Sequence, residues 1–238
     1  MDITEAMDTI NPFPEWLPFL LQTTDPLFPT GAYAHSLGLE QITRAGIVRD
    51  EASLLEFLKR EALPTLENLE LPFLRFAWQA ADAGDIGELC RIDRELDAWK
   101  VCRGLREASI QLGGRRLAAL IEVLPHPFAR LFEEQRRARA ARGHHLSVYG
   151  MQMALGGAPM EAALAAYLYQ TLAGACGAAL KLIRIGQDGC QRVLRQCLLG
   201  AAPAVRASLR VERPGWFNPL VEIAAMRHER AFERLFIS

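Results

Sequence analysis

Several patterns that mark catalytic and secreted proteins are missing from this sequence. It has no C-x-x-C pair among its five cysteines, no P-loop, no G-x-G-x-x-G turn and no H-E-x-x-H metal motif. No basic stretch followed by an apolar run opens residues 1–16, so we expect no secretory signal. An odd number of unpaired cysteines is typical of a reducing compartment. We therefore predict a cytoplasmic protein whose cysteines are small, buried, apolar residues.

The sequence also has little net charge. Its 27 basic and 28 acidic residues leave a formal charge of −1, so bulk electrostatics do not favour nucleic acid. The stretch from Ala162 to Leu180 is uncharged and long enough to cross a membrane. It consists largely of alanine and glycine and includes Gln170 and Thr171. We therefore predict a helix at the centre of a soluble bundle.

Apolar residues recur at intervals of three and four along most of the chain, and we find no run of alternating strands. Asp50 and Asp85 stand where helix N-caps are expected. Pro64 and Pro72 interrupt helical patterns, and we expect breaks or kinks there. The pattern predicts an all-α fold with roughly ten helices.

No linker is long or polar enough to separate independent units. We therefore predict a single-domain helical bundle over residues 16–225. A variable extension, residues 1–15, precedes it, and a tail, residues 226–238, follows it as a candidate partner-docking segment.

No constellation of residues in the chain supports catalysis. Ser36 lies in AHSLG, where Ala34 replaces the first glycine of a nucleophile elbow and no strand enters the turn. His35 cannot activate Ser36, since neighbouring residues on a helix point about 100° apart. We expect His144 and His145 to cap a helix or lie in solvent. The sequence thus predicts a protein that is not an enzyme and has no cofactor and no bound metal.

The basic run EEQRRARAARGHH is the remaining charged feature. Glu133 precedes Arg137 by one helical turn, so the two side chains can pair. A solvated helix face and a patch for an acidic partner or a phosphate both fit Arg136 to Arg142. If the patch binds anything, we expect an acidic protein surface.

The stretch DPLFPTGAYAHSLGLE, from Asp25 to Glu40, has the character of a shaped surface. Its prolines and glycines fix how the chain enters a helix. The stretch resembles the amino-terminal signature of the UreF family of urease accessory proteins, approximately Pro-x-Gly-x-Tyr/Phe-x-x-Ser-x-Gly-Leu-Glu. The matching residues are Pro29, Gly31, Tyr33, Ser36, Gly38, Leu39 and Glu40.

Three further stretches resemble this family in the same order, and together they cover most of residues 16–238. REASIQLGGRRL is similar to its Ser-x-x-x-Gly-x-Arg helix. HHLSVYGMQMALGG and the segment ending in LKLIRIGQ are similar to its central helices and their Leu-Ile-x-x-Gly-Gln turn. NPLVEIAAMRHERAFERLFIS is similar to its carboxyl-terminal tail. Thr30 and Ala32 depart from the residues associated with many members, which puts partner selectivity in question.

The resemblance implies a non-catalytic scaffold for urease maturation. UreF proteins are all-α, form homodimers and bind UreD, which is called UreH in some organisms. They recruit and modulate the GTPase UreG, which delivers nickel to the urease apoprotein. Two alternatives stay open: a nickel carrier that uses His35, His144, His145 and His228, or a GTPase-activating protein that inserts an arginine finger. We expect neither nucleic acid nor a membrane as a partner.

Two groups of residues are predicted to contact partners. On a helix, Tyr33, Ser36 and Glu40 share one stripe, so we expect them to contact a partner or to shape the contact surface. Replacing Glu40 by alanine should then lower urease activation and leave thermal stability nearly unchanged. The alternative is that Tyr33 and Ser36 are simply buried and hydrogen-bonded, and a large drop in melting temperature would support it. Leu235 and Phe236 are strongly apolar, so either the protein itself or a UreD-type partner should cover them. The predicted partner-binding residues are Tyr33, His35, Ser36, Glu40, Arg227, His228, Arg234, Leu235 and Phe236.

Overall fold

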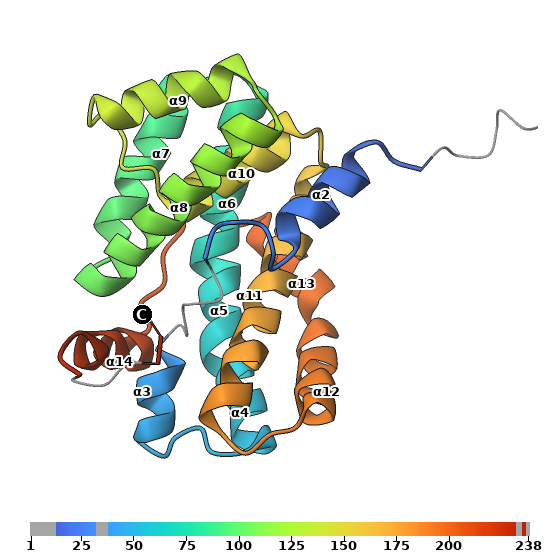
Figure 1. Cartoon of the computed structure of the whole chain (residues 1–238), viewed down its shortest axis with the longest axis vertical. Helices are drawn as coiled ribbons and strands as arrows, with labels where there is room; N and C mark the ends of the chain where they lie inside the picture. Colours follow the sequence, from blue (N-terminus) through green and yellow to red (C-terminus); the bar gives the residue numbers. More distant parts are fainter. Residues whose placement is uncertain (1–12, 32–37, 232–234, 237–238) are drawn as a thin grey trace, which may run out of the picture.

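The computed structural model describes residues 13–31, 38–231 and 235–236. These residues form helices and turns without a strand, so the predicted all-α class is confirmed (Figure 1). Outside a central rod the helices are α2 (Trp16–Thr24), α3 (Leu39–Arg44), α7 (Ile86–Trp99), α8 (Arg103–Val123), α9 (Pro127–Arg137), α10 (His145–Leu155), α11 (Met160–Leu182), α12 (Gln187–Leu198), α13 (Ala201–Ser208) and α14 (Pro219–Glu229).

The central rod is one uninterrupted helix assembled from α and π segments. It comprises α4 (Glu51–Phe57), η2 (Leu58–Ala62), α5 (Leu63–Thr65), η3 (Leu66–Glu70) and α6 (Leu71–Asp82). At each junction the backbone keeps right-handed helical angles.

The breaks predicted at Pro64 and Pro72 are wrong, because a π turn precedes each proline. The N–H of Leu63 bonds to the carbonyl of Leu58, and the N–H of Leu71 bonds to that of Leu66. A proline in a regular α-helix lacks one hydrogen bond and clashes with the carbonyl four residues earlier. The wider π turn just before each proline changes the hydrogen-bond register there, and the rod continues.

The helix starts predicted at two aspartates are confirmed. The Asp50 side chain accepts a hydrogen bond from the backbone N–H of Ser53 at 2.9 Å. Asp85 accepts one from the N–H of Glu88 at the same distance, 2.9 Å. Both bonds satisfy donors that the first turn of a helix leaves unpaired.

The core centres on α10, which packs against α6 and α8. Gly150 of α10 permits the closest approach to α6, since a Cβ there would lie 2.6 Å from the carbonyl oxygen of Leu74. On the other side, a Cβ at Gly113 of α8 would overlap the carbonyl oxygen of Gly143. Small residues at these two positions let three helices share one core.

The uncharged stretch predicted as a core helix forms most of α11. By length and composition α11 is the one helix among the described residues that could cross a membrane, and half of its most apolar window is buried. It contacts α12, α13, α6 and α2 along its length. All five cysteines are buried and free, as predicted.

Candidate functional site

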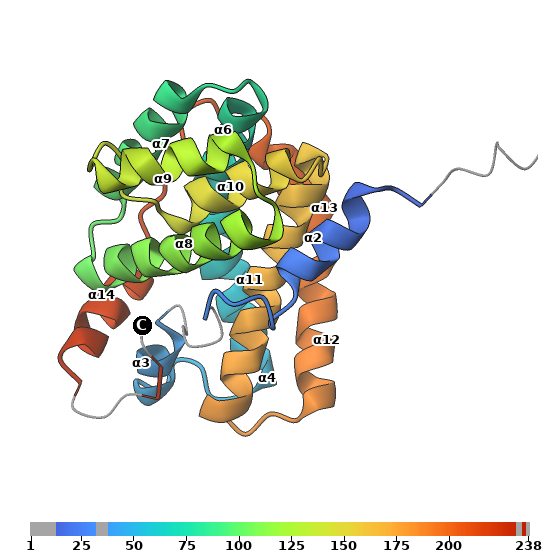
Figure 2. The same cartoon turned by 45° about the horizontal axis from the view of Figure 1, so that its top comes forward.

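The turn before α3 brings this short helix against α14. Gly38 has a φ of 77°, and a Cβ there would lie 3.3 Å from the Cβ of Ala224. Both the left-handed backbone and the close contact favour glycine. Figure 2 shows α3 and α14 side by side at one end of the molecule. Glu40, in the first turn of α3, therefore lies next to α14.

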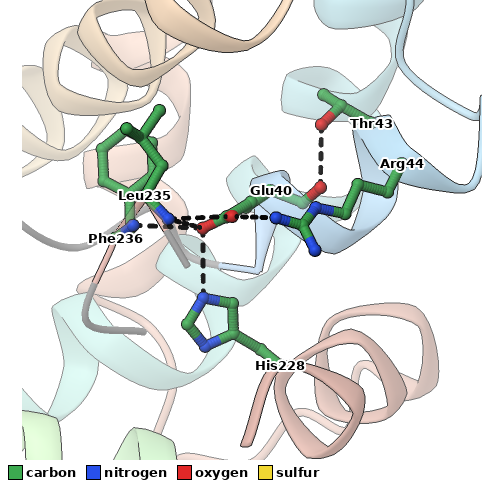
Figure 3. Close-up of polar contacts among 6 residues, drawn as sticks. All are labelled: Glu40, Thr43, Arg44, His228, Leu235 and Phe236. Carbon is green, nitrogen blue, oxygen red and sulfur yellow. Dashed lines mark hydrogen bonds and ion pairs between the residues drawn. The ribbon is translucent and has the colours of Figure 1, made fainter. Parts of the chain in front are cut away.

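The Glu40 carboxylate is the centre of a buried hydrogen-bond network (Figure 3). Its side chain is only 1% exposed. Oε1 accepts from the Arg44 guanidinium at 2.8 Å and from the backbone N–H of Leu235 at 3.0 Å. Oε2 accepts from the backbone N–H of Phe236 at 3.1 Å and lies 3.1 Å from Nε2 of His228. The carboxylate thus joins α3, α14 and the tail.

The donors around Glu40 keep it ionised. Burial alone would raise the pKa of this carboxyl, but the N–H groups of Leu235 and Phe236 and the side chain of His228 outweigh burial. The net effect lowers the pKa of Glu40 below its ordinary value of 4.5. An ionised carboxylate only accepts hydrogen bonds, so His228 donates through Nε2. Glu40 is thus an ionised and almost completely buried side chain, and not the exposed residue whose replacement would leave stability unchanged.

Leu235 and Phe236, near the end of the tail, differ in exposure. Phe236 is 5% exposed, and Nζ of Lys181 lies 5.5 Å from the centre of its ring. Leu235 is 60% exposed, although its backbone N–H is held by Glu40. The protein itself therefore covers Phe236 and leaves Leu235 at the surface. Arg227 is also exposed, on α14.

Four of the predicted partner-binding residues lie outside the described part of the chain. They are Tyr33, His35, Ser36 and Arg234. Of the predicted stripe on one helix, only Glu40 is described, and α3 itself begins at Leu39. The structure brings Glu40, His228, Leu235 and Phe236 together, as Figure 3 shows.

A second buried polar cluster joins α7, α8 and the start of α10. The Asp93 carboxylate accepts from the backbone N–H groups of Gly143 at 3.0 Å and His144 at 2.8 Å. The His144 ring lies 3.1 Å from Ser109 through Nδ1 and 3.0 Å from Asp97 through Nε2. Burial lowers the pKa of His144, although Asp93 and Asp97 act in the opposite direction.

This cluster corrects one expectation and adds a residue that sequence reasoning missed. His144 stands at the N-cap position of α10, but its side chain makes no capping bond and is fully buried. The prediction that the His144 side chain caps a helix or lies in solvent is therefore wrong. Asp93 lies on the apolar stripe of α7 between Leu89 and Leu96, and a carboxylate on such a stripe was the available signal.

Arg116 is a buried cation that the sequence reasoning also missed. It is 0% exposed, donates to the Gln152 side chain and to the carbonyl of Thr23, and lies 4.6 Å from the ring centre of Tyr149. Burial lowers its pKa to about 10. Its Nε and Nη2 have no hydrogen-bond partner in the part of the chain that the structure describes. Arg116 lies on the buried face of α8 with Gly113 and is still charged at neutral pH.

The basic run forms the end of α9 and the turn after it. Glu133 pairs with Arg137 at 2.9 Å, as predicted, and also with Arg136 at 2.7 Å. Within residues 13–31, 38–231 and 235–236, no group of three or more His, Cys, Asp or Glu side chains is placed to hold a metal ion.

Comparison with known proteins identifies the family of this chain. The family model described as UreF matches residues 48–198. The urease accessory protein UreF of Paenarthrobacter aurescens (strain TC1) is 38% identical over 221 residues, which is 92% of this chain and 96% of that protein. Those of Haemophilus influenzae (strain PittEE) and Actinobacillus pleuropneumoniae serotype 3 (strain JL03) are each 29% identical over 222 residues, covering 94% and 97% of their lengths. The chain therefore belongs to the UreF family of urease accessory proteins.

Proposed function

We propose that this urease accessory protein is a non-catalytic, cytoplasmic scaffold for nickel insertion. In this proposal it binds UreD, also called UreH, and recruits or regulates the GTPase UreG, so that nickel reaches the urease apoprotein. It acts as a homodimer, and residues 226–238 dock a partner.

The observation that supports the proposal is the way the tail is held. Two backbone N–H groups and His228 bind one buried carboxylate, and the Leu235 side chain projects from that anchor with 60% of its surface exposed. An anchored backbone with an exposed apolar side chain is a preorganised contact, because little conformational entropy remains to be lost on binding.

The test separates docking from folding within two neighbouring residues. Leu235→Asp changes an exposed side chain, so we expect an unchanged melting temperature, loss of co-elution with the UreD-type protein and lower urease activity in a nickel-supplied host. Phe236→Ala empties a buried site and should lower the melting temperature as well.

A matched control is Leu199→Asp at the C-cap of α12, where the leucine is 66% exposed. Figure 1 shows α12 and α3, the helix of Glu40, on opposite sides of α11. Leu199→Asp should change neither binding nor activation. Equal partner binding by the parent, Leu235→Asp and a chain that ends at Arg230 would refute tail docking. Stoichiometric, tightly held nickel on the isolated protein would instead support a nickel carrier.

A further inference from the structure

An apolar cleft of about 200 Å³ opens between the middle of the rod, the first turns of α8, α11 and the start of α14. Leu66 and Leu69 of the rod and Leu105 and Leu112 of α8 form its walls. Tyr167 of α11 lines it too, and its hydroxyl donates to Glu70 at 3.1 Å. The cleft is separate from the Glu40 network, which contacts the other end of α14.

Three aromatic side chains surround this cleft and remain partly in solvent. Trp99 is 38% exposed, Trp216 is 40% exposed and Phe217 is 63% exposed. The backbone just before Trp216 is held against the rod and Trp99, because Gly215 donates its N–H to the carbonyl of Asn68 and a Cβ at Gly215 would lie 2.8 Å from the Trp99 ring. Large aromatic side chains that stay exposed beside an apolar cleft are typical of a protein-binding site.

The same cleft carries more negative than positive charge. Its lining includes the carboxylates of Glu61, Glu70 and Glu222 and the single cation Lys100. None of the three carboxylates forms an ion pair with another described residue. Burial raises the pKa of Glu222, although the backbone of Cys102 and the charge of Lys100 act against it. Lys100 forms no ion pair with this partly buried carboxylate, so a second cation in direct contact with Glu222 would offset more of the cost of its burial.

We propose that this cleft binds a segment of a partner protein in which a bulky apolar side chain stands next to lysine or arginine. The apolar side chain would enter between the rod and α8, and the cation would lie between the Trp99 and Trp216 rings and the Glu222 carboxylate. An acidic segment would be repelled, and a purely apolar one would bury Glu222 without a counter-charge. The proposal rests on the proposed scaffold function only in taking the partner to be a protein.

The probe is a pair of capped hexapeptides, Gly-Arg-Leu-Phe-Arg-Gly and Gly-Glu-Leu-Phe-Glu-Gly, added to the full ¹⁵N-labelled chain. The indole N–H signals of the tryptophans report the site directly. We expect the basic peptide to shift the signals of Trp99 and Trp216 and to leave that of Trp78, which bonds to the carbonyl of Ala158, unchanged. The acidic peptide should bind at least about tenfold more weakly.

Variants of single carboxylates then test the charge. Glu222→Gln should weaken the basic peptide about fivefold and bring its affinity closer to that of the acidic peptide, which loses one repulsive charge. Glu134→Gln on the exposed face of α9 should change the affinity of neither peptide. Equal affinity for the two peptides, no shift at Trp99 and Trp216, or an unaltered affinity in Glu222→Gln would overturn the proposal. Urease activation by the parent chain is measured separately. Peptide binding without activation would count against the scaffold function alone, and activation without peptide binding would count against this site alone.

Discussion

Replacing Glu40 by glutamine keeps the shape of the side chain and removes its charge. In the parent, the carboxylate accepts hydrogen bonds from Arg44, His228 and the backbone of Leu235 and Phe236. The amide offers one acceptor oxygen and presents its own N–H groups to the remaining donors. At least one donor in a buried site therefore loses its partner.

The size of the effect follows from how much of the network is lost. A hydrogen bond to a charged group contributes about 1.5–3 kcal/mol. The tail can also detach from Glu40 in the variant. The free energy of unfolding then falls by no more than the contribution of burying Phe236, about 1.5–3 kcal/mol. We expect Glu40→Gln to lose about 3 kcal/mol of unfolding free energy, which lowers the melting temperature by about 6–12 °C in a chain of this size. This reverses the sequence-based expectation of nearly unchanged stability.

The assay is thermal unfolding followed by circular dichroism at several pH values. Because the folded state lowers the pKa of Glu40, its stabilisation is present above pH 4.5 and is lost as the pH falls through the folded value. The gap between the parent and Glu40→Gln should therefore be full at pH 7 and narrow below pH 4.5. The control Glu51→Gln breaks an exposed pair with Arg192 and should leave the melting temperature unchanged. Equal melting temperatures for parent and Glu40→Gln at pH 7 would refute the reasoning.

The remaining predictions concern α8 and the cleft. Gly113→Ala should lower the free energy of unfolding by at least about 3 kcal/mol, because the new Cβ overlaps the carbonyl of Gly143. Gly114→Ala has open space at its Cβ and should raise the free energy of unfolding by about 0.5–1 kcal/mol. Chemical denaturation measures both changes. In the same assay, Arg116→Met should be more stable than Arg116→Ala by about 2 kcal/mol, because methionine fills the core without a buried charge. Equal free energies of unfolding for the two variants would contradict this. Burial raises the pKa of Glu222 in the folded state, so its ionised form destabilises the fold. Glu222→Gln should therefore be at least as stable as the parent at pH 7, and any gain in stability should vanish below pH 4.5. A variant less stable than the parent at pH 7 would contradict this prediction.

The sequence predicted most reliably what neighbouring residues decide among themselves. The caps at Asp50 and Asp85 and the pair between Glu133 and Arg137 each depend on residues within one helical turn. The all-α class follows from periodicity summed over many such turns. These features are local, so a single sequence contains them.

The features that the sequence did not predict depend on distant partners or on backbone register. Pro64 and Pro72 have the residue type of a helix breaker, and only the hydrogen-bond register of the preceding turn tells whether the helix continues. Glu40 has the type of a surface residue, and its burial depends on His228 and the tail. Arg116 is buried for a similar reason, because Gln152 and the carbonyl of Thr23 come to it from other helices.

The Glu40 network also has an order in time. His228 lies 188 positions after Glu40 in the sequence, and Phe236 lies 196 positions after it. The ribosome therefore synthesises α3 long before these two hydrogen-bond donors exist. Until they arrive, the carboxylate remains hydrated, and α3 lacks the α14 surface on which Gly38 packs. Domains fold as units while the chain emerges, so this corner of the molecule closes late during synthesis. A chain interrupted before residue 228 would leave α3 with its α11 contacts but without the His228 and tail donors, so the surface that α14 covers would be open to chaperones and proteases.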